Sequence, residues 1–135
     1  MTALQQQGKL AKDATYILAI AGTAKKNAAL AAIADILTAR QEEWLSANAA
    51  DVAAAKEAGM RPAMLDRLTL TPERIAGIVD GVRQVMALPD PIGQVTKMET
   101  RPNGLIIGRR RVPLGVIAII FEARPNVTAD AAAPC

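Results

Sequence analysis

The sequence predicts an α/β fold in which a helical layer and a β-arm precede one strand that is buried on both faces. Apolar residues recur at helical spacing through most of residues 4–87, and the spacing becomes that of an extended chain from Val95 onward. The run Leu114–Phe121 has no polar interruption and is rich in β-branched side chains. Such a run is typical of a strand in the middle of a parallel sheet.

The composition indicates a light, helix-packed core and excludes several kinds of site. The chain has 135 residues, of which 51% are hydrophobic, and alanine is the commonest of these. One cysteine and no histidine exclude a disulfide framework and argue against a metal site. Because Met1–Gln7 is polar and no apolar run reaches membrane-spanning length, we expect a soluble, cytoplasmic protein without a signal peptide.

Amphipathic helices are expected at the start of the chain. Leu4–Ala21 carries apolar residues at helical spacing with charged residues on the other side. Thr23 is a candidate N-cap for a second helix. Residues 42–45 either continue that helix or begin a third, and we expect Trp44 to pack inward.

Further helices are marked by residues typical of helix ends. We expect Asn48 to cap a helix over Ala49–Ala58, which Gly59 ends. Pro62–Leu68 is a short helical segment. The triplet Thr71-Pro72-Glu73 then predicts a helix start, with threonine as the cap and proline at the first helical position. The strongest helical periodicity follows it, in Ile75, Ile78, Val79, Val82, Val85 and Met86.

A two-stranded arm is predicted after this helix. Val95–Arg101 is extended, Pro102-Asn103-Gly104 is a turn, and Leu105–Val112 returns as a second strand. We expect the arm to be solvated unless another subunit covers its apolar residues.

The apolar run requires neighbours that the preceding residues do not supply. A strand covered on both faces also needs partners on both edges, so we expect most of its sheet to be missing and the sequence to be the amino-terminal part of a larger protein. The polar turn Glu122–Asn126 follows the strand at its carboxyl end, where ligands bind in open α/β sheets. Val127 then begins a helix that Pro134 would shorten or disrupt.

Several segments carry a resemblance to a known family. RRRVPLGVIAIIFEARPNVTAD, LTPERIAGIVDGVRQVMALPDPIGQV, AMLDRL and ANAADVAAAKEAG closely resemble the gamma-glutamyl phosphate reductases, the glutamate-5-semialdehyde dehydrogenases of proline biosynthesis within the aldehyde dehydrogenase superfamily. The resemblance implies an incomplete aldehyde-dehydrogenase-like nucleotide-binding domain. Residues 1–93 would be its helical part, 94–112 a β-arm and oligomerisation element, and 113–135 the first core strand, active-site turn and truncated helix.

The resemblance also implies a reaction. Members of this family reduce gamma-glutamyl phosphate with NADPH through a thioester on a cysteine, which would lie beyond Cys135, so this fragment is expected to be inactive alone. Asn126 matches the asparagine whose amide helps to form the oxyanion hole. A fixed amide donor typically contributes about 3 kcal/mol there. The alternative is that Asn126 only caps the following helix.

Arg124 and the strand end are the other site candidates. Arg124 could bind the phosphate or carboxylate of the substrate, or form a salt bridge with Glu122 or Asp130. The backbone of Ile120, Phe121 and Glu122 is expected to line the NADP cleft. The resemblance further implies a homo-oligomer when the protein is intact and a partnership with glutamate 5-kinase.

The positive charge of +3 lies entirely after residue 90. Residues 1–90 hold ten basic and ten acidic side chains, whereas residues 91–135 hold six and three. Arg109–Arg111 could suggest a nucleic-acid site, but alternate strand residues face opposite sides and no aromatic residues are interleaved, which favours a solvated strand or subunit contact. Cys135 has no histidine to activate it, so a packed thiol is favoured over a nucleophile.

An alternative from another class is a small helical interaction module. It would bind a protein partner through the exposed arm and the apolar run. No contact with nucleic acid or membrane is expected in either case.

Overall fold

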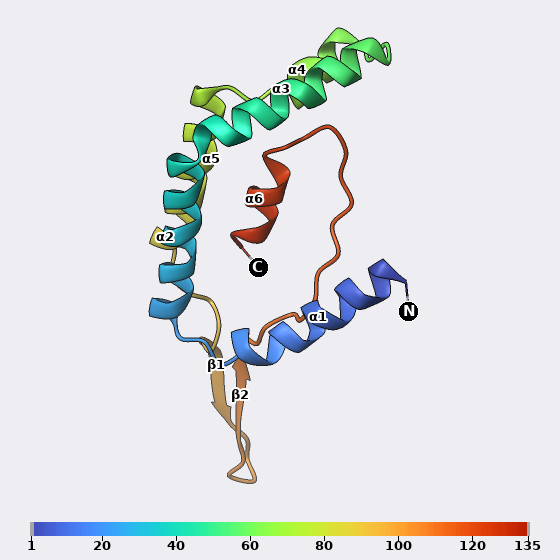
Figure 1. Cartoon of the computed structure of the whole chain (residues 1–135). Coiled ribbons are helices and arrows are strands. Elements are labelled where there is room, and N and C mark those ends of the chain that lie inside the picture. The colour runs from blue at the N-terminus through green and yellow to red at the C-terminus, as the bar shows by residue number, and fades with distance from the viewer. Residues whose placement is uncertain (1, 135) are drawn as a thin grey trace. The chain divides into compact units, whose positions relative to one another are not determined.

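The computed structural model describes residues 2–134 as a mostly helical chain with one antiparallel hairpin (Figure 1). Its elements are α1 (Ala3–Leu18), α2 (Thr23–Ala39), α3 (Gln41–Glu57), α4 (Pro62–Leu68), α5 (Pro72–Ala87), β1 (Val95–Thr100), β2 (Ile106–Arg110) and α6 (Val127–Ala132). Contacts divide these residues into two units. The first joins the chain up to Thr23 with Pro89–Ile117, and the second joins Ala24–Leu88 with the chain from Ala118 onward.

The second unit contains the core, which is built from small side chains as the composition predicts. Ala34 of α2 packs with Val79 and Val82 of α5 and with Ala133 after α6. Partly buried residues of α2 and α5 surround this cluster: Leu30, Ile33, Leu37 and Val85. Ile75 and Ile78 are also buried, so the predicted apolar stripe of α5 is confirmed.

The ends of the helices in this unit follow the predicted signals. Thr71 is the N-cap of α5, and its side chain accepts a hydrogen bond from the backbone N–H of Arg74 at 3.2 Å. Gly59 ends α3 at φ +77°. Its N–H donates to the Lys56 carbonyl, and the N–H of Met60 donates to Ala55, both at 3.0 Å, which is the Schellman arrangement.

Three predictions about the helices are wrong. Thr23 is the first residue of α2, and its hydroxyl donates to Asp90 at 3.1 Å. Asn48 lies inside α3, because the helix already begins at Gln41. Trp44 is 37% exposed and its ring lies 5.4 Å from the Arg40 guanidinium, so the cation holds it at the surface.

The first unit contains α1 and the predicted arm. β1 and β2 pair antiparallel, with Lys97 opposite Arg109 and Glu99 opposite Ile107. Glu99 forms ion pairs with Lys97 at 3.0 Å and with Arg101 at 3.1 Å. The arm is exposed almost throughout, as expected. α1 ends at Leu18, earlier than predicted, and none of its residues is buried.

The predicted buried strand is not formed. Among residues 2–134 the only strands are β1 and β2, which pair with each other, and Leu114–Phe121 lies outside any sheet. Leu114 is 91% exposed and Ile120 is 99% exposed. A strand requires a neighbouring backbone for its hydrogen bonds, and the described residues offer none to this segment. The predicted helical layer and two-stranded arm are thus confirmed, the predicted buried strand is wrong, and the domain division stays a prediction.

The helix after the polar turn is short. α6 has six residues and ends at Ala132, two residues before Pro134. This agrees with the shortening expected from a proline that cannot continue a helix.

Candidate functional site

The turn Ala123–Asn126 leads directly into α6 and belongs to the second unit. Ala123 has φ +52°, a left-handed conformation that is uncommon for a residue with a side chain. The carbonyl of Arg124 accepts from Val127 N–H at 3.1 Å, and that of Asn126 accepts from Ala129 and Asp130 at 3.1 and 3.0 Å. These bonds fix the turn to the first residues of α6.

The side chain of Asn126 is hydrogen-bonded to the carboxylate of Asp130. Its Nδ2 donates to Oδ2 of Asp130 at 2.7 Å. The backbone of Asn126 is already helical, at φ −64° and ψ −30°, and its side chain makes no capping bond. Asn126 thus occupies the N-cap position of α6, but its side chain does not cap the helix. A carboxamide has two N–H donors, so one donor remains for a ligand while the other orients the group.

A hollow of about 340 Å³ brings this turn together with the region between α4 and α5. All of it lies within the second unit. It is lined by Asp66, Arg67, Thr69, Leu70, Arg74, Arg124, Pro125 and Asn126. Two predicted site residues, Arg124 and Asn126, thus share one hollow with residues that are nearly sixty positions earlier in the chain.

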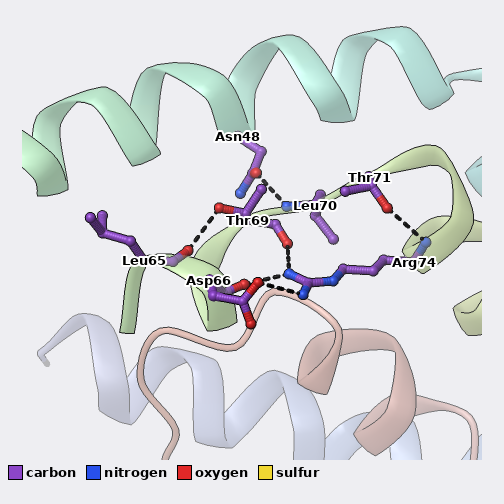
Figure 2. Close-up of polar contacts among 7 residues, drawn as sticks. All are labelled: Asn48, Leu65, Asp66, Thr69, Leu70, Thr71 and Arg74. Carbon is purple, nitrogen blue, oxygen red and sulfur yellow. Dashed lines mark hydrogen bonds and ion pairs between the residues drawn. The ribbon is translucent and has the colours of Figure 1, made fainter. Parts of the chain in front are cut away.

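Arg74 fixes the wall of the hollow that α4 provides (Figure 2). Its Nη2 pairs with Oδ1 of Asp66 at 2.8 Å, and its Nη1 donates to the carbonyls of Thr69, at 2.7 Å, and Asp66. One guanidinium therefore ties the first turn of α5 back to the last turn of α4. The charge of Arg74 is compensated by Asp66 in this arrangement.

Asn48 fixes the same connection from the side of α3 (Figure 2). Its Nδ2 donates to the Leu68 carbonyl at 2.8 Å, and its Oδ1 accepts from the Leu70 N–H at 2.6 Å. Asn48 is only 6% exposed. Asn48 thereby satisfies two backbone groups of the α4–α5 connection.

Arg67 and Arg124 give the hollow its excess of positive charge. Neither guanidinium forms an ion pair with any residue between 2 and 134. The predicted alternative of a salt bridge from Arg124 to Glu122 or Asp130 is therefore not observed. Since Arg74 is paired with Asp66, two guanidinium groups remain, and an anion is the ligand that suits them.

The chain resembles known proteins over nearly its whole length. No protein-family model matches it. It is 58% identical over 132 residues to the gamma-glutamyl phosphate reductase of Moorella thermoacetica, which covers 98% of this chain and 32% of that protein. The enzyme of the same name from Lachnospira eligens is 55% identical over 131 residues, covering 97% and 32%. The chain is therefore similar in sequence to gamma-glutamyl phosphate reductases over nearly its whole length.

Two solved structures support this similarity. Gamma-glutamyl phosphate reductase from Thermotoga maritima matches with a TM-score of 0.94 and 39% identity, covering 98% of this chain and 32% of that one. The enzyme of the same name from Saccharomyces cerevisiae matches with a TM-score of 0.92 and 34% identity, covering 98% and 34%. The chain thus spans about one third of the length of the gamma-glutamyl phosphate reductases that it matches.

The other candidate site residues lie outside the hollow. Ile120 and Phe121 are 99% and 45% exposed, Glu122 is exposed, and none of the three lines the hollow. In the part of the chain that the structure describes, no group of three or more His, Cys, Asp or Glu residues could hold a metal ion. No described helix has the length and apolar character needed to cross a membrane. The prediction about Cys135 lies outside the described residues.

Of the residues that line the hollow, the sequence indicated those of the turn after the apolar run and missed those of α4 and α5. Arg124 and Asn126 were identified because they follow the apolar run. Arg67, Arg74 and Asn48 carry no local signal, since an arginine or asparagine in a helical pattern ordinarily faces solvent. The motif AMLDRL contains two of the lining residues, Asp66 and Arg67, and was the one signal that could have indicated them.

Proposed function

We propose that this chain forms part of the substrate site of an NADPH-dependent gamma-glutamyl phosphate reductase of proline biosynthesis. The reaction would convert gamma-glutamyl phosphate, NADPH and a proton into glutamate 5-semialdehyde, phosphate and NADP+. The observation that carries the proposal is the hollow that unites Arg124 and Asn126, in a chain 58% identical to such a reductase. A chain that spans one third of its relatives supplies one part of that site.

Asn126 is assigned to the developing oxyanion. When a nucleophile attacks an acyl phosphate, the carbonyl oxygen becomes negative, and a donor that is already oriented stabilises it without reorganisation. The bond from Asn126 to Asp130 at 2.7 Å provides this orientation. The remaining N–H of the amide would donate to the oxyanion.

Arg124 is assigned to the phosphoryl group. Its guanidinium lines the same hollow as Asn126 and has no ion pair among the described residues. Guanidinium groups bind phosphate oxygens through two parallel hydrogen bonds. Arg124 would thus hold the leaving phosphate beside the carbonyl that Asn126 polarises.

The NADPH site would include Ile120, Phe121 and Glu122 as one of its walls, and these three residues alone could not bind the whole cofactor. Their exposed side chains and peptide groups could contact the ribose or nicotinamide. These three residues carry no positive charge for the pyrophosphate. When bound, NADPH supplies the hydride.

The exposed arm is proposed as an oligomerisation element. Leu105, Ile106 and Ile107 are 56%, 63% and 40% exposed, and a second subunit would cover them. Light scattering on the intact protein would give the oligomeric state. The partnership with glutamate 5-kinase and the cytoplasmic location stay predictions.

The function is tested by turnover of the protein as its organism makes it. Glutamate 5-semialdehyde, phosphate and NADP+ should yield NADPH, which is followed by absorbance. Asn126→Ala should lower kcat by about 10²–10³-fold, because one oxyanion donor is lost. Gln84→Ala, which removes an exposed carboxamide on α5, is the matched control and should leave kcat unchanged. Absence of turnover in the unmodified protein would contradict the proposal.

A further inference from the structure

We propose that Arg67 and Asp66 bind the amino-acid end of the substrate, with Arg67 on the α-carboxylate and Asp66 on the α-ammonium group. This inference rests on the proposed function, because it assigns the second end of the same hollow. It makes these two residues the determinants of specificity for an α-amino acid over a simple acyl phosphate or aldehyde. Neither would take part in the chemical step.

Arg67 has the properties that such a carboxylate site requires. It lies in the last turn of α4, its side chain is exposed, and it lines the hollow. No described residue forms an ion pair with it, whereas Arg74 next to it is held by Asp66 and two carbonyls. Arg67 is therefore the guanidinium of this wall that is available to a ligand, and it can bind a carboxylate in a bidentate manner.

Asp66 has one oxygen that is committed and one that is available. Its Oδ1 pairs with Arg74 at 2.8 Å, and its Oδ2 accepts no hydrogen bond from residues 2–134. The bond to Arg74 restrains the carboxylate, which lowers the entropy cost of binding a cation. A restrained carboxylate and an unpaired guanidinium that line the same hollow match the ammonium and carboxylate of an α-amino acid.

The charge of the residues that line the hollow also matches the charge of the substrate. Arg67, Arg74 and Arg124 are positive and Asp66 is negative, so the lining carries a net charge of +2, from three positive groups minus one negative group. Gamma-glutamyl phosphate carries a doubly charged phosphoryl group, one carboxylate and one ammonium group, and its charge is therefore equal and opposite. A hollow of about 340 Å³ is at the lower end of the range for ligand sites, as a small metabolite requires.

The α4 wall is rigid enough to discriminate between ligands. Asn48 holds Leu68 and Leu70, and Arg74 holds Thr69 and Asp66, so both ends of the α4–α5 connection are fixed. A site that is held in place rejects a ligand that leaves its polar groups unpaired. Butanal, which has the reacting aldehyde but lacks both α-substituents, would leave Arg67 and Asp66 unpaired.

The first test measures KM and kcat for the protein as its organism makes it. Arg67→Gln should raise KM for glutamate 5-semialdehyde by roughly 10–100-fold, the value of one charge-assisted contact, and leave kcat within about threefold. KM for butanal should not change. Arg61→Gln makes the same substitution just before α4, outside the hollow, and should change neither constant. Equal effects of Arg67→Gln on both substrates would overturn the inference.

The second test measures binding without turnover. L-Glutamate is the probe, because it has the α-amino acid end and no acyl phosphate. Calorimetry should show binding that Arg67→Gln weakens about tenfold or more and that Arg61→Gln, outside the hollow, leaves unchanged. Arg67-dependent glutamate binding without reductase turnover would contradict the proposed function and support this inference. Reductase turnover together with glutamate binding that Arg67→Gln does not weaken would support the proposed function and contradict this inference.

A conservative variant keeps the inference testable if Arg67→Gln does not fold. Circular dichroism would show such a failure to fold. Arg67→Lys keeps the charge but loses the bidentate geometry. It should raise KM for glutamate 5-semialdehyde severalfold and leave KM for butanal unchanged. An unchanged KM for glutamate 5-semialdehyde in this variant would overturn the inference.

Discussion

Asn48 supplies two hydrogen bonds that the connection between α4 and α5 cannot make for itself. Leu68 is the last residue of α4 and Leu70 lies between α4 and α5, so the Leu68 carbonyl and the Leu70 N–H need partners from elsewhere. Asn48 provides both from the interior of α3, at 2.8 and 2.6 Å. The side chain thus determines where the Asp66–Leu70 wall of the hollow lies.

Asn48→Ala should destabilise the protein by about 1–3 kcal/mol, because two backbone groups would lose their partner in a site with little access to water. Denaturant unfolding measures this change. Asn27→Ala is the matched control, since Asn27 makes one bond of 3.4 Å to the Met86 carbonyl. Its cost should be clearly smaller. An equal loss of unfolding free energy in Asn48→Ala and Asn27→Ala would show that Asn48 does not stabilise the α4–α5 connection.

A local pattern marked Arg124 and Asn126, which line the hollow, whereas no local pattern marked the contacts of Asn48. The first two residues follow the apolar run, so a local pattern marks them. Asn48 binds residues 20 and 22 positions away, and no local pattern records such a contact. The expectation of an N-cap at Asn48 came from its residue type, but α3 had already begun at Gln41.

α5 is the helix whose bounds and buried face the sequence predicted best. Thr71 caps it, Pro72 is its first residue, and Ile75, Val79 and Val82 are buried as the periodicity requires. Each of these signals is local and all agree with one another. Leu114–Phe121 had an equally clear local pattern, yet a strand depends on a neighbouring backbone that the pattern does not contain.

Acidification should weaken the start of α5. A hydrogen bond from its own backbone N–H, then one from the Thr71 hydroxyl, lower the pKa of Glu73. A carboxyl with a lowered pKa in the folded state contributes stability above its unfolded pKa and loses it as the pH falls through the folded pKa. The loss should therefore appear below about pH 4.3, the ordinary value for Glu.

Urea unfolding at neutral pH and at pH 3 would measure this contribution. Glu73→Gln should show a smaller loss of stability on acidification than the unmodified protein. Glu122→Gln makes the same substitution outside the helices and should retain the full loss. Identical pH dependence in Glu73→Gln and the unmodified protein would contradict the assignment.

The apolar segment Leu114–Phe121 determines how the chain behaves as a whole. It contains Ile117 and Ile119, which are 51% and 48% exposed, and no charged residue interrupts it. The sequence predicts that this segment belongs in a sheet. The predicted strand is wrong because the pattern reports the surroundings that a segment requires, whereas a strand forms only beside a neighbouring backbone.

The isolated 135-residue chain should self-associate through this segment. Uncharged segments of six or seven residues with high β-propensity form intermolecular strands when they are exposed. The apparent mass from light scattering should rise with concentration, and Ile117→Lys should suppress the rise, because a charge in the segment opposes strand stacking. Ile20→Lys is the matched control, since Ile20 is 87% exposed outside the segment and its replacement should leave self-association unchanged. A monomer at all concentrations, or equal suppression by both substitutions, would show that the segment does not drive association.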